Sequence, residues 1–178
     1  MVAALQPRSP PGATMIRMPP VRRITVERNR LRFAAAHMAT FAGDCEPLHG
    51  HNYDIMIELE GPLTEDAWVW DFGATKRLAK AIADELDHKF LLQAKSEHIT
   101  SRREGSNWIV SYKDRTYQFP ATDVLPLPVL NTTVECISEW FANRLIGDLQ
   151  AAGATHLSRL TIGIEEMPGQ AGWYTVEM

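Results

Sequence analysis

Three histidines lie close enough in the sequence to bind one metal ion: His37, His49 and His51. A single residue separates His49 from His51, and side chains at positions i and i+2 of an extended strand point to the same face. His37 ends an earlier apolar alternation, so antiparallel pairing of the two strands would add its ring to that face. Three imidazoles with an open fourth position are typical of a catalytic zinc site, whereas structural sites have four protein ligands.

Cys45 lies four residues before His49 and leaves a second interpretation open. Its thiolate could be the fourth ligand of a closed Cys-His₃ shell, which would indicate a structural metal. In the alternative, the thiol stays off the metal and acts on a substrate. Metal analysis of a Cys45→Ala variant separates the two, since loss of zinc would identify Cys45 as a ligand.

Two extended segments are expected to position these side chains. Residues 22–37 read as a strand whose inward parity changes near Arg28-Asn29-Arg30, which predicts a bulge or bend there. Residues 49–59 alternate strictly between apolar and polar side chains, and Gly61-Pro62 ends this strand. The inward residues of the second strand are Tyr53, Ile55, Ile57 and Leu59.

Two helices and two further strands complete the predicted α+β domain. One helix starts after Asp71, which suits the N-cap, and the other runs from Thr132 or Thr133 to Gly153. Strands are expected at about 156–166 and 172–177. Residues 93–130 form an insert, in which Trp108–Tyr112 and Thr116–Phe119 predict a hairpin that turns at Lys113-Asp114-Arg115.

The composition is that of a globular protein without a polyanion-binding surface. The 178 residues are 45% hydrophobic and 22% charged, with a net charge of −4, so a basic nucleic-acid-binding face is not expected. The two cysteines do not resemble a secreted disulfide framework, and no apolar run approaches the ~18 residues of a membrane span. Residues 1–20 read as a disordered tail before one domain at 21–178, in a cytoplasmic protein.

Several motifs occur in order along the chain. They are Phe33-Ala34-Ala35-Ala36-His37, Cys45-x-x-x-His49-Gly50-His51-Asn52-Tyr53, Trp70-Asp71-Phe72, Leu86-Asp87-His88 and Thr133-Val134-Glu135. Together they resemble the 6-pyruvoyl-tetrahydropterin synthase and 6-carboxy-5,6,7,8-tetrahydropterin synthase family. The resemblance implies a tunnelling fold (T-fold), with a four-stranded antiparallel sheet and two helices on one face. It also implies trimeric rings that stack as homohexamers, active sites between subunits, and a pterin triphosphate substrate.

The resemblance also implies roles for individual residues. His37, His49 and His51 would hold Zn²⁺, Cys45 would be the general base, and Asp87 with His88 would form a second acid/base pair. Adjacent residues on a helix do not face each other, so the Asp87–His88 pair requires a non-helical link. His88 also suits a second role, that of a cation at the C-terminus of a helix.

Three residues are candidates for binding the pterin ring. The guanidine-like edge of a pterin suits a carboxylate, and strand parity favours Glu166 over its neighbour Glu165, because Glu166 shares the inward parity of the strand before it. The resemblance adds Thr133 and Glu135. Thr132 and Glu135 also have the spacing of a capping box, in which Thr132 would be the N-cap of the helix.

The expected reaction is a zinc-dependent lyase reaction on 7,8-dihydroneopterin triphosphate. The principal expectation is 6-carboxy-5,6,7,8-tetrahydropterin with loss of acetaldehyde and triphosphate, on the route to queuosine. Elimination of triphosphate alone would give 6-pyruvoyl-tetrahydropterin. Glu46 directly follows Cys45, and this pair resembles family members that carry both residues, which implies cleavage to 6-hydroxymethyl-7,8-dihydropterin for folate; Glu46 also suits a solvent-exposed loop. A non-enzymatic, zinc-stabilised pterin- or purine-binding module remains the alternative.

Overall fold

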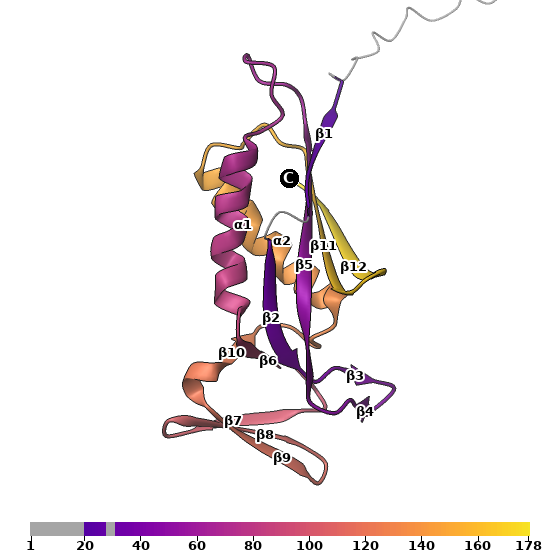
Figure 1. Cartoon of the computed structure of the whole chain (residues 1–178), viewed down its shortest axis with the longest axis vertical. Coiled ribbons are helices and arrows are strands. Elements are labelled where there is room, and N and C mark those ends of the chain that lie inside the picture. The colour runs from indigo at the N-terminus through magenta and orange to yellow at the C-terminus, as the bar shows by residue number, and fades with distance from the viewer. Residues whose placement is uncertain (1–19, 28–30) are drawn as a thin grey trace, which may run out of the picture.

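A seven-stranded mixed sheet forms the centre of the computed structural model, which describes residues 20–27 and 31–178 (Figure 1). Apart from Pro20, the predicted tail lies outside the described residues, as does the bulge predicted at Arg28–Arg30. The strands follow the order β10-β6-β2-β5-β11-β12, and β1 also pairs with β5. Their bounds are β1 Arg22–Val26, β2 Arg32–His37, β5 His49–Gly61, β6 Lys89–Gln93, β10 Val124–Leu127, β11 Arg159–Met167 and β12 Gln170–Glu177.

Strand β5 is the long central strand that β1 and β2 both contact. Val26 of β1 lies opposite Ile57, whereas Arg32 of β2 lies opposite Asp54. Val26 and Arg32 are six positions apart in the chain, whereas their partners on β5 are three positions apart, so β1 and β2 are two separate strands on β5. Antiparallel pairing of β2 with β5 puts His37 opposite His49.

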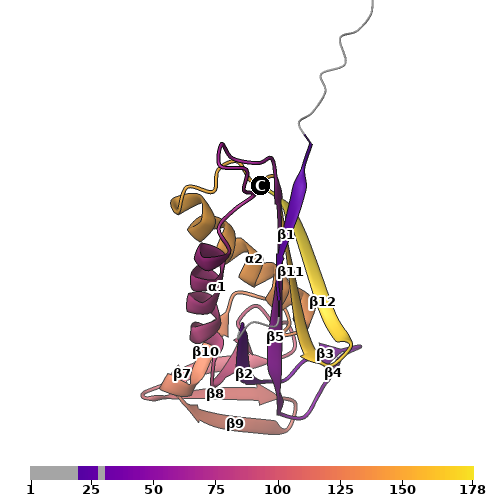
Figure 2. The ribbon, with the colours of Figure 1, turned by 45° about the horizontal axis from the view of Figure 1, so that its top comes forward.

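Two helices cover one face of the sheet, α1 (Phe72–Leu86) and α2 (Val134–Ala151) (Figures 1 and 2). The predicted N-cap Asp71 accepts a hydrogen bond from the Ala74 amide, which satisfies one of the free donors in the first turn of α1. The core lies between these helices and the inward side chains of β5. Its fully buried members include Tyr53, Ile55, Ile57, Leu59, Ile82, Leu86, Ile137, Phe141, Leu145 and Leu149.

The insert forms more than the predicted hairpin, because its strand β10 joins the main sheet beside β6, which precedes the insert apart from Gln93. Strand β6 pairs with β2 and with β10, both in parallel, so the sheet is neither four-stranded nor wholly antiparallel. In β6, Leu91 packs in the main core, while Phe90 and Leu92 pack in a second apolar cluster. A strand buried on both faces lacks the alternation by which a half-buried strand is recognised.

The rest of the insert forms a separate three-stranded antiparallel sheet. Its strands are β7 (Thr100–Glu104), β8 (Asn107–Tyr112) and β9 (Arg115–Pro120), followed by a 3-10 turn at Ala121–Asp123. The second apolar cluster joins side chains of the inserted sheet, such as Val110, to side chains of β6 and β10, such as Phe90 and Val124. Figure 1 shows the inserted sheet next to β6 and β10. The β8–β9 hairpin is the predicted one. No helix in the described part of the chain is long and apolar enough to cross a membrane.

Candidate metal centre and active site

The three predicted ligands form one group at the end of the paired strands β2 and β5. One ligand atom from each of His37, His49 and His51 lies within 4.8 Å of the others. The Nε2 atoms of His37 and His49 are 3.2 Å apart, and the rings of His49 and His51 have centroids 4.9 Å apart. The three imidazoles therefore converge, as a metal ion requires.

Backbone carbonyls orient two of these rings through the other ring nitrogen. His37 Nδ1 lies 2.8 Å from the Thr132 carbonyl oxygen, and His49 Nδ1 lies 2.8 Å from that of Pro47. Because a carbonyl can only accept, each Nδ1 carries the proton and each Nε2 presents its lone pair. Burial lowers the pKa of His37 to about 4, so this imidazole is neutral near pH 7, as a ligand must be.

Cys45 does not join this group in the described part of the chain. Cys45 belongs to β4 (Asp44–Cys45), which pairs with β3 (Thr40–Phe41). Its side chain is 9% exposed and packs in the second apolar cluster with residues such as Phe90 and Val110. Burial raises the pKa of the thiol, and the nearby Arg115 guanidinium opposes this effect.

Glu46, rather than Cys45, approaches the histidines directly. Its Oε2 atom lies 3.8 Å from Nε2 of His49, and its side chain is 54% exposed. Because Cys45 lies at the end of a strand, the side chains of Cys45 and Glu46 point to different sides. The structure therefore presents a solvent-accessible carboxylate beside the three imidazoles.

Asp87 and His88 form the predicted pair through a non-helical link at the end of α1. Asp87 is extended, with ψ 131°, and His88 is left-handed, with φ 58°. Asp87 Oδ2 lies 2.9 Å from His88 Nδ1, while Oδ1 accepts a hydrogen bond of 2.7 Å from the Ala34 amide. The Ala34 hydrogen bond is the largest cause that lowers the pKa of Asp87, and His88 adds to it.

The depression beside His88 gathers only some of the candidate site residues. His88 is 82% exposed and lines an open depression of about 540 Å³ whose lining also includes His51. Cys45, Glu46 and Glu166 do not line this depression. Within residues 20–27 and 31–178, no hydrogen bond or ion pair joins His88 to the three-histidine group.

Glu166 lies beside the histidines, and its neighbour does not. Glu166 Oε2 is 3.9 Å from His51 Nε2, whereas Glu165 Oε1 accepts a hydrogen bond of 2.8 Å from the Gly169 amide in the β11–β12 turn. Tyr53 was not predicted as a site residue, yet its ring centroid is 5.4 Å from that of His51. Its position two residues after His51 in an alternating strand was the available signal.

The predicted capping box at the start of α2 is wrong. The N-cap is Thr133, without a side-chain cap, and Thr132 is buried. The Thr132 hydroxyl instead donates a hydrogen bond of 3.0 Å to Gln93 Oε1, and Thr132 lies one residue before the N-cap. Glu135 is exposed in the first turn of α2, where a carboxylate interacts favourably with the helix dipole.

Comparisons with known proteins agree with this arrangement. The family model of 6-pyruvoyl tetrahydropterin synthase matches residues 25–177. A putative 6-carboxy-5,6,7,8-tetrahydropterin synthase of Methanocaldococcus jannaschii is 33% identical over 145 residues, which cover 81% of this chain and 89% of that protein. The 6-carboxy-5,6,7,8-tetrahydropterin synthase of Haemophilus influenzae is 30% identical over 115 residues, 61% of this chain and 72% of that protein.

A solved structure extends the likeness to three dimensions. The 6-pyruvoyltetrahydropterin synthase of Plasmodium vivax, in a form in which a catalytic glutamate is replaced by alanine, superposes with a TM-score of 0.84. It is 26% identical, and the match covers 89% of this chain and 99% of that one. The fold is thus a T-fold, with three histidines able to hold a metal ion. The chain belongs to the 6-pyruvoyl tetrahydropterin synthase family of pterin synthases.

Proposed function

We propose that the chain is a zinc-dependent 6-carboxy-5,6,7,8-tetrahydropterin synthase, which acts on 7,8-dihydroneopterin triphosphate and releases acetaldehyde and triphosphate. The observation that carries this proposal is the convergence of three imidazoles with carboxylates beside them and without a thiolate ligand. Three neutral nitrogen ligands leave a position open for substrate. The names of the M. jannaschii and H. influenzae relatives support the choice of product.

Some of the site residues bind the substrate, and others transfer protons. Bound zinc would supply Lewis acidity to the side-chain oxygens of the substrate. Glu166 accepts hydrogen bonds from the N–H edge of the pterin. Thr133 and Glu135, which belong to another of the motifs that resemble the family, also bind the pterin. Cys45 removes a proton from the substrate side chain, and His88, oriented by Asp87, transfers another.

We further propose that the active site is completed between subunits. His88 is exposed, and within one chain it makes no contact with the three-histidine group in the described residues. Homo-oligomerisation in trimeric rings that stack as hexamers would bring this pair to the site of a neighbouring copy. The product would enter queuosine and other 7-deazapurine synthesis in the cytoplasm.

A second product is favoured by the position of Glu46. Its carboxylate lies 3.8 Å from His49 Nε2, whereas the Cys45 thiol is buried in the second apolar cluster. The P. vivax relative, whose form in the structure lacks a catalytic glutamate, supports a carboxylate as an acid/base group in this fold. Glu46 would direct cleavage to 6-hydroxymethyl-7,8-dihydropterin.

Incubation of the zinc-loaded protein with 7,8-dihydroneopterin triphosphate tests both proposals. We expect chromatography with mass detection to identify 6-carboxy-tetrahydropterin, with a minor hydroxymethyl product that Glu46→Ala abolishes. Cys45→Ala should retain zinc and lose the carboxy product. Glu65→Ala is a matched control, because Glu65 is an exposed loop carboxylate. Release of 6-pyruvoyl-tetrahydropterin alone would refute the proposed product, and zinc loss in Cys45→Ala would refute the role of Cys45.

A further inference from the structure

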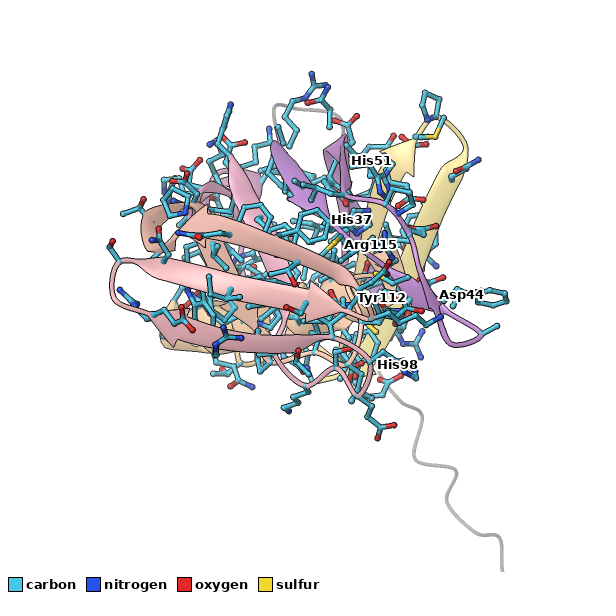
Figure 3. All side chains as sticks on the ribbon, turned by 90° about the horizontal axis from the view of Figure 1, so that it is seen from below. His37, Asp44, His51, His98, Tyr112 and Arg115 are labelled. Atoms are coloured by element: carbon cyan, nitrogen blue, oxygen red, sulfur yellow. The ribbon has the colours of Figure 1, made fainter. Side chains whose placement is uncertain are left out.

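The turn between β8 and β9 of the inserted sheet contacts the segment that carries Cys45 and Glu46. Arg115 donates two hydrogen bonds, from Nη2 to the Cys45 carbonyl oxygen at 2.5 Å and from Nη1 to that of Glu46 at 3.2 Å. Tyr112 donates its hydroxyl to the Gly43 carbonyl oxygen at 2.6 Å. Figure 3 shows Tyr112 and Arg115 beside the ribbon that bears Asp44, with His37 and His51 beyond them.

The contacted segment has little regular structure of its own. Strands β3 and β4 contain two residues each, and the turn between them has positive φ at both Ala42 and Gly43. So short a ribbon is marginally stable without outside support. Its main chain is also held by the hydrogen bond of 2.9 Å from the Glu46 amide to the Ala39 carbonyl oxygen and, at its start, by two bonds between Thr40 and the Asn131 side chain, at 3.0 and 2.7 Å.

Two adjacent carbonyl groups held by one guanidinium determine the orientation of two side chains. With these peptide groups held, Cys45 points into the apolar cluster and the Glu46 carboxylate points toward His49. The guanidinium fork is suited to this geometry because its donors are rigid and diverge in one plane. Its charge also opposes the effect of burial on the pKa of Cys45.

We propose that Arg115 is a positioning residue for the reaction: it orders the Cys45–Glu46 segment against the metal centre from the inserted sheet. The proposal rests on the proposed function in one respect, namely that Cys45 and Glu46 act on the substrate. The inserted sheet then contributes to the active site without contacting the substrate. A purely structural role would affect the stability of the protein and leave the rate per folded, zinc-loaded chain unchanged.

Arg115→Met and Arg115→Lys, with Lys113→Met as the matched control, test this role. Lys113 lies in the same turn, but its Nζ pairs with the Asp44 side chain, at 3.1 Å, and not with a carbonyl of the segment. We expect Arg115→Met to lower kcat roughly 10- to 100-fold, since small misplacements of reacting groups have effects of this size, while KM and zinc content change little. Arg115→Lys should recover part of kcat, and Lys113→Met should remain within about twofold of the wild type.

Hydrogen exchange of residues 40–48 separates this inference from the proposed function. We expect faster exchange of this segment in Arg115→Met than in Lys113→Met, whether or not the pterin is turned over. Unchanged exchange, or an unchanged kcat in folded Arg115→Met, would overturn the positioning role. If Arg115→Met does not fold, hydrogen exchange of residues 40–48 and kcat are measured in Arg115→Lys, and unchanged values of either would overturn the positioning role. Absence of turnover in the wild type would refute the proposed function, and exchange would still decide whether Arg115 orders the segment.

Discussion

Replacement of Tyr53 by phenylalanine is expected to stabilise the protein. The Tyr53 side chain is fully buried, and its hydroxyl has no hydrogen-bond partner among residues 20–27 and 31–178. Its ring stacks on Phe33, with centroids 4.6 Å apart, and the substitution keeps this contact. The change therefore removes a buried polar atom without creating a cavity on the side of the ring that packs.

The expected gain follows from the cost of leaving a buried hydroxyl unpaired. That cost is ~1–3 kcal/mol, and part of it is recovered by local adjustment, so we expect the free energy of unfolding to rise by about 1 kcal/mol. For a chain of 178 residues, this corresponds to an increase in Tm of roughly 2–4 °C. Burial raises the pKa of Tyr53, so the hydroxyl is neutral throughout the working pH range.

Tyr112→Phe provides a control with the opposite expected sign. The Tyr112 hydroxyl donates to the Gly43 carbonyl oxygen at 2.6 Å, and loss of this bond should lower the free energy of unfolding by ~0.5–1.5 kcal/mol. Urea unfolding of both variants without zinc, at one protein concentration, gives the comparison. Destabilisation by Tyr53→Phe as large as that by Tyr112→Phe would refute the reasoning, because it would mean that the Tyr53 hydroxyl is paired in the folded protein.

Four other substitutions test the site and the elements around it. His49→Ala removes one of three ligands, so zinc should fall from about one ion per chain to a small fraction of that value after dialysis. Elemental analysis measures the zinc content. Unchanged zinc would contradict the site. Gly50→Ala should destabilise by ~1–3 kcal/mol, because its Cβ would lie 2.8 Å from the Ala35 carbonyl oxygen. Gly147→Ala, in open space on α2, should instead stabilise by ~0.5–1 kcal/mol, and equal urea midpoints would contradict both. Asp87 has a folded pKa below its ordinary 3.8, so its contribution to stability is present above that pH and is lost as the pH falls through the lower value. The stability difference between wild type and Asp87→Asn should therefore narrow on acidification below pH 3.8, and a difference independent of pH would contradict the Ala34 hydrogen bond.

The features that sequence reasoning predicted are those that depend on local geometry. The convergence of His49 with His51 follows from the two-residue period of a strand, and it needs no knowledge of distant contacts. The N-cap at Asp71 follows in the same way from the first turn of a helix. His37 required one further assumption, that its strand pairs antiparallel with β5, and the register confirms it.

The features that sequence reasoning missed depend on contacts between distant segments of the chain. Strand β6 is buried on both faces, so its apolar residues show no alternation. Thr132 has the spacing of a helix cap, yet its hydroxyl bonds to Gln93, far along the chain, and this contact removes it from the helix end. The two bonds from Arg115 to the Cys45–Glu46 segment likewise span about 70 residues. A hairpin turn that is rich in charge gives no sign of such a partner.

The choice between the two proposed products can be traced to this same distant contact. The family resemblance made Cys45 the prominent acid/base candidate, whereas the structure buries its thiol and turns the Glu46 carboxylate toward His49. One side chain, Arg115, holds the carbonyl groups of both residues. Loss of Arg115 should therefore lower the carboxy and hydroxymethyl products together, whereas Glu46→Ala should remove only the second. A variant of Arg115 that changes one product and spares the other would show that the two residues are oriented independently.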